Sequence, residues 1–214
     1  MLVKICGITT KEAAICALEN GADFLGFVFY GTSPRNITAR GAADICASLE
    51  RKVKTVAVTV DANDNFLREL LEIFKPDYLQ LHGNESPERA NEIKTLSNLM
   101  IIKALSVASN ENPIDLKAKA QSYYGIANML LFDAKPAKGE IPGGNARSFN
   151  WEVLQSMKLD LPWFLSGGLS ASNIVEATKI SGAKAIDVSS GVETVRGIKD
   201  IELIKEFLQT AKTI

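Results

Sequence analysis

Short runs of Val, Ile, Leu and Phe alternate along this chain with longer segments in which apolar residues recur at helical spacing. The apolar runs have the length of strands and lie at 2–6, 24–29, 54–60, 78–81, 100–105, 129–133, 163–165 and 185–188. Between them, the segments 11–19, 66–74 and 202–209 place their apolar residues three or four positions apart, on one side of a helix. The pattern therefore predicts strands that alternate with helices.

Eight such repeats fit the 214 residues at about 27 residues each, close to the smallest size of a strand–helix unit. Strict alternation predicts parallel strands joined by right-handed crossovers. Two architectures satisfy this, an open doubly wound sheet and a closed (β/α)8 barrel. No Gly-x-Gly-x-x-Gly turn follows the first strand, and no linker or change of composition divides the chain. We therefore expect an α/β fold with a single TIM barrel domain over residues 1–214.

Polar residues interrupt several of these strands. A strand of such a barrel is covered on both faces, so it is expected to be almost entirely apolar. The exceptions are Lys4 and Cys6 in the first strand, Gln80 and His82 at the fourth, Lys103 in the fifth, Asp133 in the sixth and Asp187 in the last. We expect the apolar set to face the helices and the polar set to face the barrel interior. Several polar residues would then meet at the carboxyl ends of the strands, where barrel enzymes build their active sites.

Each of these polar residues also has a structural explanation. Cys6 can be a small buried hydrophobic residue, as free cysteines commonly are. His82, the only histidine, can be held by structural hydrogen bonds beside the turn that follows it. Asp133 can cap a turn or pair with a lysine, and Lys103 most simply belongs to a charge-compensated network inside the barrel, since an unpaired buried charge is costly.

Two glycine-bearing turns follow the last two predicted strands, at 166–170 and 187–193. Barrels often bind phosphate after their seventh and eighth strands, and the positive end of a short helix adds to the attraction. Glycine lets the backbone approach an anion closely because it has no Cβ. We expect the backbone amides of Gly167, Gly168, Ser190 and Gly191 to converge on one phosphate, and Ser170 or Ser172 to cap the next helix.

The charge balance excludes some partners. Lys and Arg together number 24 against 25 Asp and Glu, a net charge of -1, so no overall attraction to nucleic acid or acidic membranes is expected. The three cysteines form no disulfide framework or metal-binding pair, which favours a reducing, cytoplasmic location. A charge within the first residues argues against a signal peptide, and no apolar run approaches the ~20 residues of a membrane span.

Several motifs, in order and from end to end, resemble those of the phosphoribosylanthranilate isomerase family. They are Lys4-Ile-Cys-Gly-Ile-Thr9, the run 21–30 with the Ser33-Pro-Arg35 that follows, Gln80-Leu-His-Gly83, Leu131-Phe-Asp-Ala-Lys135, Ser166-Gly-Gly-Leu169 and Asp187-Val-Ser-Ser-Gly-Val-Glu193. A single Gly-Gly turn would be weak evidence. Their shared order, with polar groups at the predicted strand ends, makes the resemblance specific.

The resemblance implies an Amadori rearrangement of a phosphorylated sugar–anthranilate substrate, without cofactor or metal, in tryptophan biosynthesis. It implies Asp133 as the acid that protonates the ribose ring oxygen and Cys6 as the base that removes the C2′ proton. It places Arg35 at the anthranilate carboxylate, which a guanidinium can grip with two nitrogens, and Gln80, His82 and Asp187 in the substrate site. A monomer or homodimer is expected.

The acid and the base each need help from their surroundings. A free thiol is only a few per cent ionised at neutral pH, so Cys6 would benefit from a nearby cation. Asp133 must hold a proton often enough to donate it, which burial or a neighbouring carboxylate would favour. We expect Asp187 to supply part of that effect.

One stretch departs from the family pattern. In 143–151, Asn145 and Ala146 stand where Thr or Ser and then Gly are typical, and Asn150 replaces the usual Asp. Alanine does not readily adopt a positive φ, which argues against loop closure or a phosphate contact from this loop. Two alternatives stay open. One is another phosphate-binding barrel enzyme, such as an epimerase or the related isomerase of histidine biosynthesis, which is expected to carry an Asp at the position of Cys6. The other is a non-catalytic protein that binds an anionic metabolite or a partner protein.

Overall fold

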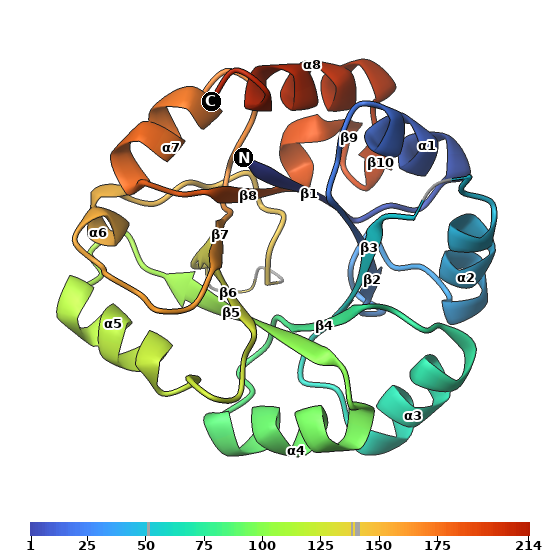
Figure 1. Ribbon diagram of the computed structural model, residues 1–214, viewed down its shortest axis with the longest axis horizontal. Coiled ribbons are helices and arrows are strands. Elements are labelled where there is room, and N and C mark those ends of the chain that lie inside the picture. The colour runs from blue at the N-terminus through green and yellow to red at the C-terminus, as the bar shows by residue number, and fades with distance from the viewer. Residues whose placement is uncertain (51, 138, 140–141) are drawn as a thin grey trace.

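Eight parallel strands close into one barrel in the computed structural model, which describes residues 1–50, 52–137, 139 and 142–214 (Figure 1). Each strand pairs in parallel with its neighbour in sequence, and β8 closes on β1 through pairs such as Lys4 with Asp187. The strands are β1 (Leu2–Cys6), β2 (Phe24–Phe29), β3 (Lys54–Thr59), β4 (Tyr78–Leu81), β5 (Met100–Val107), β6 (Met129–Ala134), β7 (Trp163–Leu165) and β8 (Ala185–Val188). The predicted TIM barrel is confirmed.

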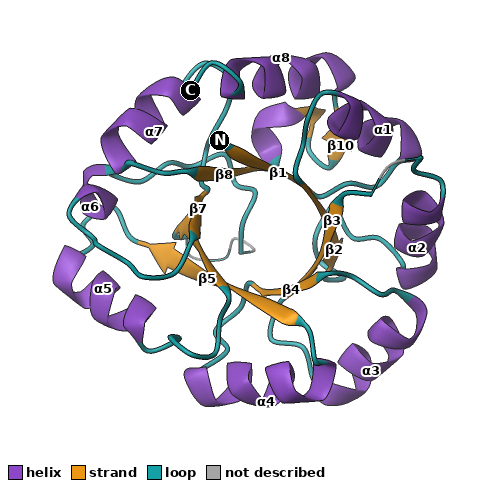
Figure 2. Cartoon of the chain, viewed as in Figure 1, coloured by secondary structure: helices purple, strands orange, loops and turns teal. Residues whose placement is uncertain are grey.

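Helices form a ring outside the barrel (Figure 2). They are α1 (Lys11–Glu19), α2 (Ala39–Ala47), α3 (Asp64–Ile73), α4 (Pro87–Ser97), α5 (Pro113–Gln121), α6 (Glu152–Gln155), α7 (Ile174–Ser181) and α8 (Ile201–Ala211). Most begin at a side chain that caps the first free backbone amides, among them Thr10, Asn63 and Asp200. The local sequence therefore sets where these helices begin.

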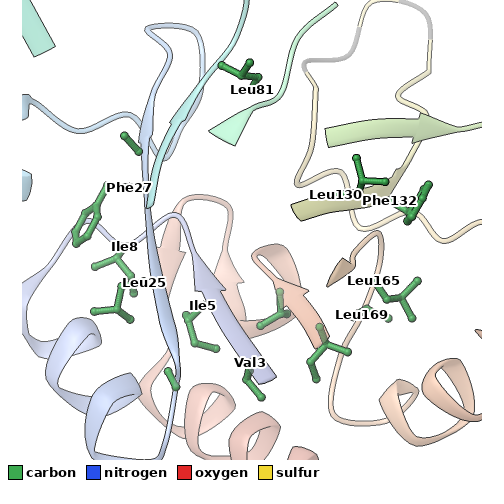
Figure 3. Close-up of a cluster of buried hydrophobic side chains, with 14 of the residues drawn as sticks. Val3, Ile5, Ile8, Leu25, Phe27, Leu81, Leu130, Phe132, Leu165 and Leu169 are labelled. Carbon is green, nitrogen blue, oxygen red and sulfur yellow. The ribbon is translucent and has the colours of Figure 1, made fainter. Parts of the chain in front are cut away.

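The hydrophobic core has two layers, and side-chain alternation along the strands separates them. Residues such as Val3, Ile5, Leu130 and Phe132 point outward and pack with helix residues, and Figure 3 labels them among other members of this outer layer. The inner layer fills the barrel and comes from strands alone, with Phe24, Val56, Tyr78, Ile102, Leu131 and Phe164 among its members. The outward-apolar and inward-polar pattern expected from the sequence is confirmed for β1, β4, β6 and β8.

Lys103 is the exception, and its predicted place inside the barrel is wrong. It shares the outward side of β5 with Ile101 and Leu105, which pack in the outer layer. Its ammonium group lies 2.7 Å from Glu85 Oε2 and also donates to the carbonyl oxygens of Leu81 and Gly83. Lys103 is therefore compensated by a carboxylate outside the barrel rather than by the charges within it.

Strands outside the barrel follow β8 and were not expected from the sequence. A single 3₁₀ turn, η1 (Ser190–Val192), leads into the antiparallel hairpin of β9 (Glu193–Val195) and β10 (Ile198–Lys199), and α8 follows. Strands of only three and two residues give too short a pattern to detect. The hairpin matters because it carries charged side chains to the mouth of the barrel.

Candidate active site

Two adjoining cavities open at the carboxyl ends of the strands. One is lined by Cys6, Arg35, His82 and Asp133 with the apolar side chains of Val28, Val58 and Val60, and the other by the turns after β7 and β8. Asp133, Gly143, Gly144, Ser166, Asp187 and Ser189 line both. The sequence-predicted acid and base therefore border the same space, next to the predicted phosphate turns.

Cys6 ends β1 and points into the barrel beside a buried lysine. Burial raises the pKa of the Cys6 thiol above its ordinary value, while the Lys4 ammonium opposes this effect by its charge and by a hydrogen bond. Gly26 on the neighbouring strand makes room, since a Cβ there would stand 2.8 Å from Cys6 Sγ. The expected cation is present, but desolvation outweighs it, so Cys6 rests as a neutral thiol.

Asp187 compensates Lys4 instead of acting as an unpaired charge. Its Oδ1 lies 2.8 Å from Lys4 Nζ, and its Oδ2 accepts a hydrogen bond of 3.1 Å from Ser166 Oγ. Both charged side chains are almost fully buried. Lys4 therefore offsets the charge of Asp187, and the expected effect of Asp187 on Asp133 stays a prediction.

Asp133 instead meets the histidine. His82 Nε2 lies 3.2 Å from Asp133 Oδ2, and His82 Nδ1 lies 2.7 Å from the amide nitrogen of Gln80. With that amide donating to Nδ1, the ring carries its hydrogen on Nε2 and donates it to Asp133. Asp133 Oδ1 also accepts the backbone amide of Ala134. Gln80 is fully buried and hydrogen-bonds to His82, which in turn contacts Asp133.

Arg35 lies in the loop after β2 and forms a salt bridge with the hairpin. Its Nε and Nη2 are each 2.7 Å from an oxygen of Glu193, and Nη2 also donates to the carbonyl oxygen of Gly144. Glu193 additionally accepts from Lys199. Glu193 lies in one of the motifs that carry the family resemblance, but neither it nor Lys199 was predicted to have a role. No local spacing could reveal an ion pair whose members are 158 residues apart.

The two glycine turns meet as expected, with one difference. Gly167, Gly168 and Ser190 line the second cavity together with Leu169 and Ser189. Gly191 does not line it, and packs against the turn after β7 instead, where a Cβ would stand 1.8 Å from the carbonyl oxygen of Leu169. Gly191 therefore brings the two turns together.

The prediction that Ser170 or Ser172 caps the next helix is wrong. Asn173 occupies the cap position of α7 and makes no side-chain capping bond. The two serine hydroxyls bond to each other at 2.8 Å. Asn173 instead uses its side chain to fix the turn itself, because it accepts from the Ser170 amide and donates to the carbonyl oxygen of Gly168.

The unusual loop after β6 stands over the cavities. Ala146 adopts φ 54° despite its Cβ, so the expected avoidance of positive φ is wrong at this residue. Gly143, Gly144, Asn145 and Arg147 line the second cavity. The hairpin residue Arg196 donates to Asn145 Oδ1 at 3.2 Å. The hydrogen bond from Arg196 thus holds Asn145, the residue next to the strained backbone of Ala146.

Among the described residues, no group of three or more His, Cys, Asp or Glu side chains could hold a metal ion. Within the same residues, none of the helices has both the length and the apolar character that crossing a membrane requires.

Comparisons with known proteins agree on one family. The family described as N-(5'phosphoribosyl)anthranilate (PRA) isomerase matches residues 3–210. Proteins named N-(5'-phosphoribosyl)anthranilate isomerase from Brucella canis and Brucella abortus are 49% identical over 208 residues, which is 97% of this chain and 92% of theirs.

Solved structures point the same way. The phosphoribosyl anthranilate isomerase of Thermotoga maritima is similar with a TM-score of 0.86 and 35% identity, over 100% of both chains. A phosphoribosyl anthranilate isomerase in complex with reduced 1-(o-carboxyphenylamino)-1-deoxyribulose 5-phosphate gives a TM-score of 0.82 at 32% identity, again over 100% of both chains. The similarity therefore extends through the whole barrel.

Proposed function

Since this chain belongs to the N-(5'-phosphoribosyl)anthranilate isomerase family and is an isomerase of tryptophan biosynthesis, we propose that Cys6 and Asp133 carry out its proton transfers. The observation that carries the proposal is that both side chains are buried and border one cavity at the mouth of the barrel. An Amadori rearrangement requires an acid and a base beside one sugar, and a carboxyl group and a thiol can fill these roles.

Asp133 acts first, as the general acid. It donates a proton to the ribose ring oxygen, the bond from C1′ to that oxygen breaks, and the nitrogen lone pair forms an iminium with C1′. The Asp133 carboxylate that is left accepts a hydrogen bond from His82 Nε2, 3.2 Å away, which stabilises the negative charge. In this role His82 and Gln80 position and support the acid.

Cys6 acts second, as the general base. The thiol first gives its proton to solvent at the mouth of the barrel, and the resulting thiolate removes the proton from C2′. The electron pair of that C–H bond forms the C1′–C2′ double bond, and the iminium nitrogen becomes neutral. The enol then loses its hydroxyl proton while C1′ gains a proton, which gives the 2-ketone. Because burial keeps the pKa of Cys6 raised, the thiolate is favoured only when positive charge is close. The iminium supplies that charge at the step that needs the base, and Lys4 adds to it.

The two ends of the substrate are anions, and each has a place in the proposal. We assign the phosphate to the turns that contain Gly167, Gly168 and Ser190, with Gly191 packed behind them. We assign the anthranilate ring to the apolar wall of the other cavity and its carboxylate to Arg35. Asp187 supports this site from below through its ion pair with Lys4.

The test is loss of the substrate's fluorescence with Cys6→Ala and Asp133→Asn. Both variants should lose kcat by about 10²–10⁴-fold, the usual contribution of general acid–base catalysis, and should keep the circular dichroism of the unmodified chain. Cys16→Ala is the matched control, because Cys16 is also a buried cysteine but lies on α1, away from both cavities. Rates within a factor of about two for Cys6→Ala would refute its role as the base.

The same assay separates the related enzyme class. The unmodified chain should consume phosphoribosylanthranilate, and a chain that converts only the aminoaldose of histidine biosynthesis would contradict the proposed substrate. We also infer that the chain is a monomer or homodimer, and a relative from Thermotoga maritima is described as dimeric. Sedimentation or light scattering measures this directly.

A further inference from the structure

A buried carboxylate lies directly behind the arginine of the substrate cavity. Glu193 faces the Nε–Nη2 edge of Arg35 with both oxygens, at 2.7 Å each, and both side chains are only 3% exposed. Paired, parallel hydrogen bonds of this kind fix the plane of a guanidinium as well as its position. Arg35 therefore has a set orientation before any ligand binds.

Glu193 is itself held from the hairpin on which it lies. Lys199 Nζ donates to Oε1, and the backbone amide of Gly197 donates to Oε2 at 2.9 Å. Lys199 is fixed in turn by the backbone and hydroxyl oxygens of Ser189, at 3.0 and 3.3 Å. These donors outweigh desolvation and lower the pKa of Glu193 to about 2. The carboxylate is thus ionised throughout the range in which an enzyme is assayed.

The pairing decides which nitrogen of Arg35 can reach a ligand. Nε is used by Glu193, and Nη2 is used by Glu193 and by the carbonyl oxygen of Gly144. Nη1 makes no hydrogen bond within the described part of the chain. A two-nitrogen grip on a ligand carboxylate, expected from the sequence, is therefore not open to Arg35 in this arrangement. Nη1 is left as the donor, beside the cavity that Arg35 lines.

The charges of this cluster do not balance. Arg35 and Lys199 carry two positive charges, and Glu193 carries one negative charge. The other carboxylates that line the cavity are engaged elsewhere: Asp187 pairs with Lys4, and Asp133 with His82. One further negative charge next to Arg35 would neutralise the cluster in a desolvated place, where Coulomb interactions are strong.

We propose that Glu193 is a positioning residue that aims Arg35 Nη1 into the ring cavity and so makes the site selective for an aryl amine with a carboxylate beside its nitrogen. The inference rests on the proposed function, because it concerns the specificity of the same reaction. Glu193 acts through Arg35 and does not touch the reacting atoms.

The test compares two substrates in Glu193→Gln. One is phosphoribosylanthranilate, and the other is its carboxylate-free counterpart, N-(5'-phosphoribosyl)aniline. A glutamine presents an NH2 group to one of the Arg35 nitrogens, so the guanidinium loses its fixed orientation. We expect KM for the carboxylated substrate to rise about tenfold, the value of one charge-assisted hydrogen bond, with little change in kcat. The aniline substrate should keep its kcat/KM, so selectivity falls about tenfold.

The variant Arg35→Ala tests whether Glu193 acts through Arg35. If Glu193 acts through Arg35, the double variant Arg35→Ala/Glu193→Gln should show no further loss of selectivity beyond Arg35→Ala. Glu193→Asp provides a variant that keeps the charge, since its shorter side chain cannot face both Arg35 nitrogens. We expect it to lose part of the selectivity, so the inference stays testable if Glu193→Gln does not fold.

The variant Glu85→Gln is the control for a purely structural effect. Glu85 is as buried as Glu193 and pairs with Lys103 on the outer side of the barrel. Its replacement should lower stability and change both substrates by the same factor. If Glu193→Gln also changes both substrates equally, or if Arg35→Ala and Glu193→Gln add fully, the inference is overturned. Failure of the proposed function is distinguishable, because the unmodified chain would then not convert phosphoribosylanthranilate at all.

Discussion

The protonation state of the Cys6 thiol is a feature of this site that can be measured directly. Burial is the largest effect on Cys6 and raises its pKa above the ordinary 9.0, while Lys4 opposes it. A thiol whose pKa is raised in this way is neutral at neutral pH. The base is therefore formed during the reaction, when positive charge develops beside it, and is not stored in the free enzyme.

The ultraviolet absorbance of the thiolate measures this property directly. In the Cys16→Ala/Cys46→Ala variant, Cys6 is the remaining cysteine, and we expect its thiolate to appear only above the pH at which a solvent-exposed cysteine ionises. Adding Lys4→Met and Asp187→Asn removes the cation without leaving an unpaired charge, and should move the midpoint higher still. A midpoint near neutral pH in the first variant would contradict the resting neutral thiol.

At the scale of elements, the close contact of two turns holds the predicted phosphate site together. Gly191 in η1 approaches the carbonyl oxygen of Leu169 so closely that a methyl group would stand 1.8 Å from it. Gly191→Ala must push the turn after β8 away from the turn after β7. We expect a rise of about tenfold in KM for the phosphorylated substrate and in the inhibition constant of inorganic phosphate, through the loss of well-placed amide donors.

Gly31→Ala is the matched control for that prediction. Gly31 lies in the loop after β2, has no positive φ, and a Cβ built there meets nothing within 4 Å. Its replacement should leave KM, phosphate inhibition and the melting temperature unchanged. If Gly191→Ala lowered the melting temperature but left phosphate inhibition as it was, Gly191 would be a packing residue and the phosphate would lie elsewhere.

The bounds of most barrel strands could be predicted from the sequence. The barrel strands are short and nearly all apolar, so their positions follow from the local sequence. The strands β1, β2, β4, β7 and β8 have the bounds that were predicted. The ends of β3, β5 and β6 differ by one or two residues, because backbone pairing with a neighbour decides the last residues. Alternation along the strand correctly placed Cys6, Asp133 and Asp187 inside the barrel.

The rest required contacts that no local pattern contains. Lys103 interrupts its apolar strand in the same way as Lys4, yet it faces outward. There it forms an ion pair with Glu85, which lies in the loop before α4. The partner of Arg35 lies at the other end of the chain. Phosphate turns can be predicted because glycine marks them, whereas ion pairs depend on which two elements the barrel brings together.

For the whole molecule, the hairpin carboxylate links stability to pH. The pKa of Glu193 is lowered from 4.5 to about 2 in the folded state, and burial works against this while Arg35, Lys199 and Gly197 bring it about. Above about pH 4.5 the group is ionised both folded and unfolded, and its stabilising effect is fully present. As the pH falls, the unfolded chain takes up a proton that the folded chain resists, so stability declines until the pH passes about 2.

The loss over that interval is roughly 3 kcal/mol, since each unit of pKa corresponds to about 1.4 kcal/mol. Glu193→Gln removes this titration, so its free energy of unfolding should be lower than that of the unmodified chain above pH 5 and should change less between about pH 5 and 2. Urea unfolding at a series of pH values measures both curves. Glu206→Gln, an exposed carboxylate on α8, should instead give a curve parallel to the unmodified chain. Arg35, Lys199 and Glu193 form one desolvated cluster. If the curve of Glu193→Gln also ran parallel to that of the unmodified chain, the cluster would not hold its charges in the folded protein. The electrostatic reason for Arg35 to face the ring cavity would then be lost.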